Sequence, residues 1–158
     1  MHIVLVEPEI PGNTGNIARL CAAEHLTLHL VEPLGFQIDD KHLKRAGLDY
    51  WDLLDVHVHP NYDSVVRMLA GHHFYLNTTK AIRSYTDISY DGDDVLVFGK
   101  ETKGLPEELL RSHKEDCIRI PMIEGAFPEF IKCGGDCGNG SDAPGRISPF
   151  AETERSFI

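Results

Sequence analysis

The chain has 158 residues, 42% of them hydrophobic, and a formal net charge of −10 at pH 7. This length suits one domain with a real core, and no apolar run approaches the roughly 18 residues of a membrane-spanning helix. The negative charge argues against a broad basic surface for nucleic acid, although it leaves room for a local basic patch. The start of the chain lacks the basic stretch of a signal peptide, so we expect a cytoplasmic protein without a membrane partner.

Strand-like and helix-like segments alternate along the chain. Short apolar runs that end at turn residues predict strands at residues 2–6, 26–31, 56–58, 74–78, 95–98 and 118–121. Helix-favouring segments lie between several of them, at residues 17–23, 39–46, 62–69 and 107–111. Asn13 or Thr14 is the expected N-cap of the first helix. The alternation predicts an α/β fold, a parallel sheet flanked by helices.

A glycine-bearing loop, Gly99 to Gly104, follows the strand predicted at residues 95–98. Pro106 and two acidic residues then begin a helix. Strand, glycine loop and helix form the arrangement in which α/β proteins hold anionic or nucleotide-like ligands, and the glycines are expected to let the backbone approach such a ligand. An ordinary tight turn is the alternative, because glycine loops are weak motifs. The dinucleotide fingerprint G-x-G-x-x-G is absent, so we do not expect a cofactor to be held in the usual dinucleotide manner.

No metal site is predicted. Cys133 and Cys137 lack a second pair of ligands, so the four cysteines are expected to be free thiols. His57 and His59 alternate along one predicted strand, but no carboxylate at a suitable spacing completes a site. We therefore interpret these two histidines as unpaired surface or core residues.

A local basic cluster stands out against the acidic composition. Lys41, Lys44 and Arg45 fall within five residues, and helical spacing would place them on one face. The cluster is a candidate site for RNA phosphates. A solvated helix face is the alternative interpretation.

Four stretches carry more information than periodicity. They are Glu7-Pro-Glu-Ile-Pro-Gly-Asn-Thr-Gly-Asn-Ile-Ala-Arg19, Asp40-Lys-x-Leu-Lys-Arg-Ala-Gly-Leu-Asp-Tyr50, Phe98-Gly-Lys-Glu-Thr-Lys-Gly-Leu-Pro106 and Ile118-Arg-Ile-Pro-Met122. Together they resemble the SPOUT class of RNA 2′-O-ribose methyltransferases, and most closely its bacterial members that methylate the wobble nucleotide of leucine tRNAs. The resemblance covers residues 1 to about 125, which we expect to form the methyltransferase domain.

The resemblance implies an enzyme, a homodimer that uses S-adenosyl-L-methionine to methylate the 2′-hydroxyl of the wobble cytidine or modified uridine in a tRNA anticodon stem-loop. It also implies a C-terminal trefoil knot. The cofactor residues that it implies are Asn77, Thr78, Gly99, Glu101, Gly104, Ile120 and Met122. Glu101 is expected to order the glycine loop.

The catalytic residues that the resemblance implies are Arg19, Asn16 and Asn13. Because a guanidinium has a pKa above about 12, Arg19 is a poor base. We expect it instead to hold the neighbouring phosphate and orient the ribose hydroxyl, with the phosphate itself as a candidate proton acceptor.

The family pattern stops near Ala126. Residues 127–158 contain no Leu and no Val but five Gly, a composition typical of disorder. Codons for Phe-Pro-Glu-Phe-Ile-Lys at 127–132, read one base later, can encode Ser-Leu-Asn-Leu-Ser, the signature with which the family continues. We infer a slip of the reading frame, an aberrant and disordered tail at 126–158, and an incomplete knot.

The missing signature leaves an alternative function open. The chain would then be an inactive remnant or a non-catalytic RNA-binding module. A nicotinamide-dependent oxidoreductase is disfavoured, because the dinucleotide fingerprint is absent.

Overall fold

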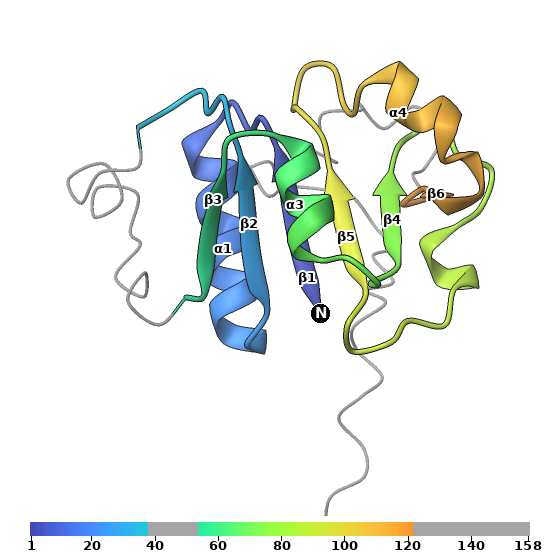
Figure 1. Cartoon of the computed structure of the whole chain (residues 1–158), viewed down its shortest axis with the longest axis horizontal. Coiled ribbons are helices and arrows are strands. Elements are labelled where there is room, and N and C mark those ends of the chain that lie inside the picture. The colour runs from blue at the N-terminus through green and yellow to red at the C-terminus, as the bar shows by residue number, and fades with distance from the viewer. Residues whose placement is uncertain (38–53, 122–158) are drawn as a thin grey trace, which may run out of the picture.

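The computed structural model describes residues 1–37 and 54–121. Within them, six parallel strands form one sheet in the order β3-β2-β1-β5-β4-β6 (Figure 1). The strands are β1 (His2–Val6), β2 (Thr27–Val31), β3 (Val56–His59), β4 (Phe74–Asn77), β5 (Val95–Phe98) and β6 (Cys117–Ile118). The helices are α1 (Pro11–Glu24), α3 (Tyr62–Met68) and α4 (Glu107–Ser112), with 3-10 turns η2 (Tyr85–Asp87) and η3 (Lys114–Asp116). The predicted parallel α/β fold is confirmed.

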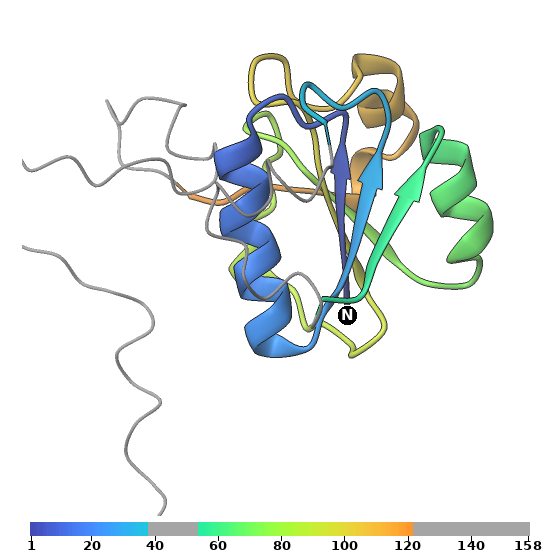
Figure 2. The same cartoon turned by 90° about the vertical axis from the view of Figure 1, so that its left-hand side faces the viewer.

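Helices cover both faces of the sheet, as Figures 1 and 2 show. On one face, Ala18 and Cys21 of α1 pack with the inward side chains Ile3, Leu5, Leu28 and Leu30. On the other face, Val65 of α3 and Leu110 of α4 belong to one cluster with Val4, Val6, Val95 and Val97. Burial on both faces explains why β1 and β5 read as continuous apolar runs, and not as alternating ones.

The order of the strands positions a site. From β1 the chain builds outward through β2 and β3, and then crosses to the other side of β1, where it forms β4 and then β5, which lies between β1 and β4. The direction therefore reverses between β1 and β5, which pair with Leu5 opposite Phe98. Ligands of open parallel sheets bind at such a switch point, beyond the carboxyl ends of the strands.

The first helix begins earlier than predicted. It starts at Pro11, and its N-cap is Ile10, whose side chain makes no capping hydrogen bond. Proline fixes the backbone angle that the first helical position needs, so the helix begins there without a polar cap. The prediction of Asn13 or Thr14 as N-cap is wrong, because both residues lie inside α1 and are buried.

The interpretation of His57 and His59 as unpaired is also wrong: His57 Nε2 lies 3.0 Å from Asp55 Oδ1, and His59 is part of a chain of histidines. His29 Nε2 lies 3.1 Å from His2 Nδ1, and His29 Nδ1 lies 3.0 Å from His59 Nε2. These residues sit on the neighbouring strands β1, β2 and β3, on one face of the sheet. His29 is fully buried, and burial lowers its pKa to about 4.

Three further predictions concern free thiols, membrane helices and metal sites. Cys21 and Cys117 are free thiols. No helix among residues 1–37 and 54–121 is long and apolar enough to cross a membrane, and no metal-binding group occurs in these two ranges. The helix predicted at 39–46, the remaining cysteines and the tail from 126 lie outside the described residues.

Candidate active site

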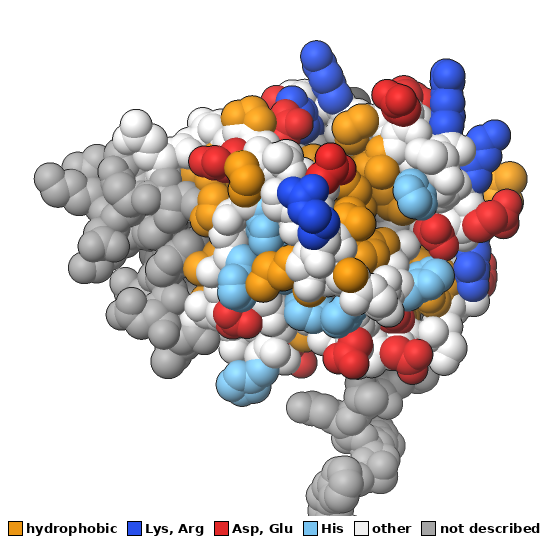
Figure 3. All heavy atoms as spheres, in the orientation of Figure 1, with side chains coloured by type: hydrophobic (Ala, Val, Ile, Leu, Met, Phe, Trp, Pro, Cys, Tyr) orange, Lys and Arg blue, Asp and Glu red, His pale blue; other side chains and the backbone are white. Residues whose placement is uncertain are grey.

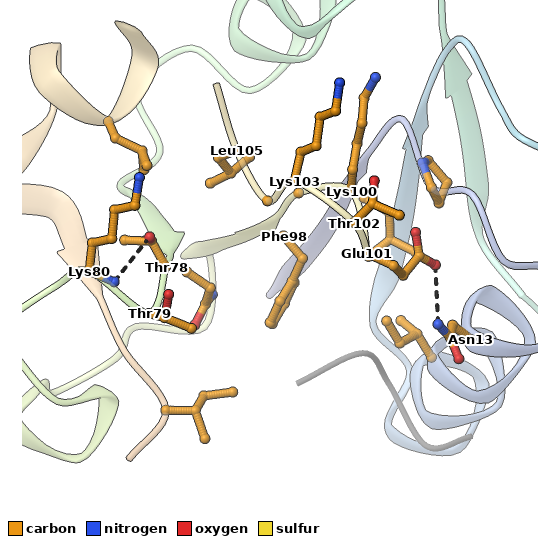
Figure 4. Close-up of a pocket in the computed structure, with 18 of the residues that line it drawn as sticks. Asn13, Thr78, Thr79, Lys80, Phe98, Lys100, Glu101, Thr102, Lys103 and Leu105 are labelled. Atoms are coloured by element: carbon orange, nitrogen blue, oxygen red, sulfur yellow. Dashed lines mark hydrogen bonds between the residues drawn. The ribbon is translucent and has the colours of Figure 1, made fainter. Parts of the chain in front are cut away.

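A cavity of about 430 Å3 lies at the carboxyl ends of β1, β5 and β4, at the switch point of the sheet (Figure 4). Its wall combines the start of α1, the turn after β4, the glycine loop after β5, and α4. The lining residues are Leu5, Pro8, Asn13, Thr14, Ile17, Asn77, Thr78, Thr79, Lys80, Phe98, Gly99, Lys100, Glu101, Thr102, Lys103, Gly104, Leu105, Leu110 and Ile120. Segments more than ninety residues apart thus meet around one space.

The glycine loop closes on itself. Gly104 N donates a hydrogen bond of 2.8 Å to Lys100 O, and Gly104 adopts a φ of +69°. A Cβ on Gly99 would lie 2.1 Å from the carbonyl carbon of Gly104. We expected these glycines to admit a ligand close to the backbone. In the structure, glycine is required at position 99 because the backbone of Gly104 lies so close to it. This contact within the loop shapes the loop before any ligand binds.

Two carboxylates clasp the glycine loop to the start of α1. Glu101 Oε2 accepts a hydrogen bond of 2.8 Å from Glu9 N, and Oε1 accepts from Ile10 N at 3.2 Å and from Asn13 Nδ2 at 3.3 Å. In return, one Glu9 oxygen accepts from Thr102 N at 3.1 Å and from its hydroxyl at 2.7 Å. The predicted role of Glu101 in ordering the loop thus has a geometric basis in this reciprocal arrangement.

Charges around the clasp are balanced locally. The hydrogen bond from the Thr102 hydroxyl lowers the pKa of Glu9. Beside it, Lys100 pairs with Glu7, and this hydrogen bond raises the pKa of Lys100. Both groups therefore stay ionised at neutral pH and hold the rim of the cavity in place.

Polar groups on the opposite wall are held by the sheet. Asn77 Nδ2 donates to Val97 O at 3.4 Å, and Thr78 N donates to Ile118 O at 2.9 Å. Facing them, Thr14 Oγ1 is buried and has no hydrogen-bond partner among the described residues. A buried hydroxyl normally has a partner, so this atom suits a polar ligand in the cavity.

The structure brings most of the expected cofactor residues together. Asn77, Thr78, Gly99, Glu101, Gly104 and Ile120 all line the cavity, and so does Asn13. Asn16 and Arg19 lie on α1 with exposed side chains and are not among the lining residues. Met122 and the basic cluster of Lys41, Lys44 and Arg45 lie outside the described residues.

Several lining residues were not predicted. Thr14 lies next to Asn13 in the same motif, so that motif could have indicated it. Phe98 and Leu105 flank the glycine loop, and Leu110 is on the inner face of α4. Their apolar character gave no signal that separates a cavity wall from an ordinary core.

Comparisons with known proteins agree with this geometry. The model of the SpoU rRNA Methylase family matches residues 1–127. The tRNA (cytidine(34)-2′-O)-methyltransferase of Methylovorus glucosotrophus is 49% identical over 122 residues, which cover 77% of this chain and 79% of the relative. A solved structure described as giving structural insights into the 2-OH methylation of C/U34 on tRNA has a TM-score of 0.74 and 36% identity, covering 83% of this chain and 88% of the other.

A more distant structure supports the fold alone. The SpoU methyltransferase AviRb from Streptomyces viridochromogenes, in complex with AdoMet, has a TM-score of 0.67 at 22% identity. The match covers 80% of this chain and 50% of the AviRb chain. The predicted resemblance to RNA ribose methyltransferases is confirmed: the chain belongs to the SpoU rRNA Methylase family.

Proposed function

We propose that this chain is an S-adenosylmethionine-dependent methyltransferase that acts on the ribose 2′-hydroxyl of nucleotide 34 of tRNA. The observation that carries the proposal is the cavity at the switch point of the sheet. It is built from the 7–19 and 98–106 motifs of a family in which a relative of 49% identity is a tRNA (cytidine(34)-2′-O)-methyltransferase.

The residues around the cavity fit the proposed cofactor. Leu5, Phe98 and Leu105 offer apolar surface for an adenine ring, while Thr14 Oγ1 is buried without a partner among the described residues. Backbone groups of the turn after β4 and of the glycine loop supply further polar contacts. When bound, S-adenosylmethionine supplies a methyl group on a positively charged sulfur, which is already activated for transfer.

The chain itself must position the ribose. We assign to Arg19 the phosphate next to the target nucleotide, because its side chain is exposed and a guanidinium has N–H donors but no acceptor atom for the hydroxyl proton. Asn16 lies one turn before Arg19 on the same helix and is assigned to RNA contact. Asn13 donates its amide to Glu101, so its proposed role is to hold α1 against the glycine loop.

Three parts of the proposal concern partners and location. The substrate contact is the anticodon stem-loop, because nucleotide 34 lies there, and Lys41, Lys44 and Arg45 are proposed to contact its backbone. The chain is proposed to act as a homodimer in the cytoplasm. Light scattering during gel filtration tests the dimer, and a monomer at working concentration would contradict it.

Methyl transfer tests the function directly. The full chain is incubated with a leucine tRNA and isotope-labelled S-adenosylmethionine, and the digested tRNA is analysed by mass spectrometry. Label on the ribose of nucleotide 34 is the expected result. A chain with residues 127 onward replaced by the shifted-frame sequence serves as the comparison.

The second candidate function is a non-catalytic RNA-binding module. It is favoured by the end of the family match at residue 127 of 158. Binding of tRNA without transfer by the full chain, together with transfer by the shifted-frame chain, would select this alternative. Absence of both binding and transfer in both chains would refute the proposed function.

A further inference from the structure

A second cavity of about 880 Å3 lies beside the first. Thr78, Lys80 and Leu110 line both cavities, so the two share a wall. The remaining lining residues of the second cavity are Ala81, Ile82, Arg83, Asp87, Glu107, Arg111, Lys114, Glu115 and Cys117. The proposed reaction assigns no role to any of these residues.

Positive charge is concentrated around the two cavities. The described residues include nine Lys and Arg, and six of them line one cavity or the other: Lys80, Arg83, Lys100, Lys103, Arg111 and Lys114. Figure 3 shows such side chains gathered over the side of the molecule that carries α4. On a chain of net charge −10, this asymmetry indicates an anionic partner on that side.

Most of the cations in the second cavity form no ion pair with another described residue. Lys80 pairs with Glu107, but no ion pair among the described residues includes Arg83, Arg111 or Lys114. Of the acids in the lining, Glu107 is taken by Lys80, and Asp87 accepts a hydrogen bond from Ser84 N. Glu115 is the third acid, so the lining has four cations against three acids, a surplus of one positive charge.

The lining also includes apolar residues. Ala81 and Leu110 are buried, whereas the side chain of Ile82 is 95% exposed. An exposed apolar side chain next to unpaired cations suits a nucleotide, whose base needs apolar contact and whose phosphate needs charge. No aromatic residue is in the described lining, so phosphate contacts and the planes of the arginine side chains would dominate recognition.

We propose that the second cavity binds the single-stranded RNA that adjoins the target nucleotide. Phosphates of this segment contact Arg83, Arg111 and Lys114, and an unpaired base lies over Ile82. The RNA then continues past the shared wall at Lys80 into the first cavity. This inference rests on the proposed function, because the RNA bound in the second cavity is the segment next to the target nucleotide.

Salt-dependent binding of RNA tests the inference on the full chain. The probe is a fluorescent anticodon stem-loop RNA of a leucine tRNA, titrated at several salt concentrations. Arg83→Gln, Arg111→Gln and Lys114→Gln are compared singly and together, and Arg67→Gln on α3 is the matched control, since it removes the same charge away from both cavities. Each lost phosphate contact should reduce the slope of log K against log salt by about 0.7.

Two further variants separate the contributions. Arg83→Lys, unlike Arg83→Gln, should keep the salt slope of the parent chain. Ile82→Ala should lower the affinity for RNA and leave the salt slope unchanged. The cations are exposed, so these changes leave the core intact, which thermal unfolding verifies. A triple variant with the unaltered slope and affinity of the parent chain would overturn this inference and leave the proposed function standing. A parent chain that binds neither the stem-loop nor whole tRNA would overturn both.

Discussion

The buried His29 should make the stability of the fold sensitive to mild acid. Burial lowers its pKa to about 4, and the neighbouring His2, His59 and His57 act in the same direction, while Asp55 opposes them. In the unfolded chain the ordinary value is 6.5. Between these two values the unfolded chain binds a proton that the folded chain does not, so stability rises with pH. The stability that neutral His29 contributes is complete above about pH 6.5 and is lost as the pH falls toward 4.

The size of the effect follows from the difference between the two values. One pH unit corresponds to about 1.36 kcal/mol, so the full loss is about 3 kcal/mol. By pH 5 about 2 kcal/mol should already be lost, a large share of the net stability of about 5–15 kcal/mol of a typical domain.

The hydrogen bonds limit the three histidines to one added proton. Neutral His29 carries one N–H, so it donates to one of its neighbours and accepts from the other. One added proton fits on any of the three rings, because both bonds can run away from a protonated His2, His29 or His59. A second proton would place two N–H groups against each other in one of the bonds. Burial lowers the pKa of both end residues as well.

Urea unfolding at pH 7.5 and pH 5 measures the effect. His29→Val keeps a strand-favouring side chain but removes the titrating group, so its loss of stability between the two pH values should be about 2 kcal/mol smaller than that of the parent. His25→Asn is the matched control, because His25 is exposed and has a left-handed φ of 53° that Asn tolerates. Equal losses in the parent and in His29→Val would refute the reasoning.

Four other predictions address the site and the RNA contacts. Gly99→Ala places a Cβ 2.1 Å from the Gly104 carbonyl carbon, so calorimetry should show a lowered Tm and weakened S-adenosylmethionine binding, whereas Gly92→Ala, which meets nothing within 4 Å, should change neither. Thr102→Val removes the hydroxyl that lowers the pKa of Glu9, so an NMR titration should find that pKa raised, and an unchanged value would contradict the clasp. Arg19→Ala, in the shifted-frame chain, should lose most methyl transfer with an unchanged circular dichroism spectrum; near-normal turnover would remove Arg19 from the mechanism. Replacing Lys41, Lys44 and Arg45 by Gln should flatten the salt dependence of tRNA binding, and an unchanged slope would show a solvated face.

The sequence by itself determined the kind of fold and the family. In the apolar run at residues 2–6, residues 3–6 are buried on both faces of the sheet, and their pattern reports burial directly. The motifs at 7–19 and 98–106 indicated the methyltransferase family, and residues of both motifs line the first cavity. The boundary near residue 125, the slip of the frame and the knot remain predictions.

Only the tertiary structure decided which residues meet. Glu9 and Thr102 are far apart in the chain, and they form hydrogen bonds because the strand order places β1 beside β5. In the same way, His29 meets His2 and His59 because β2 lies between β1 and β3. The second cavity joins residues 78–87 to residues 107–117 across β4 and α4. Periodicity describes the environment of one element at a time, whereas these contacts depend on the order in which the elements pack.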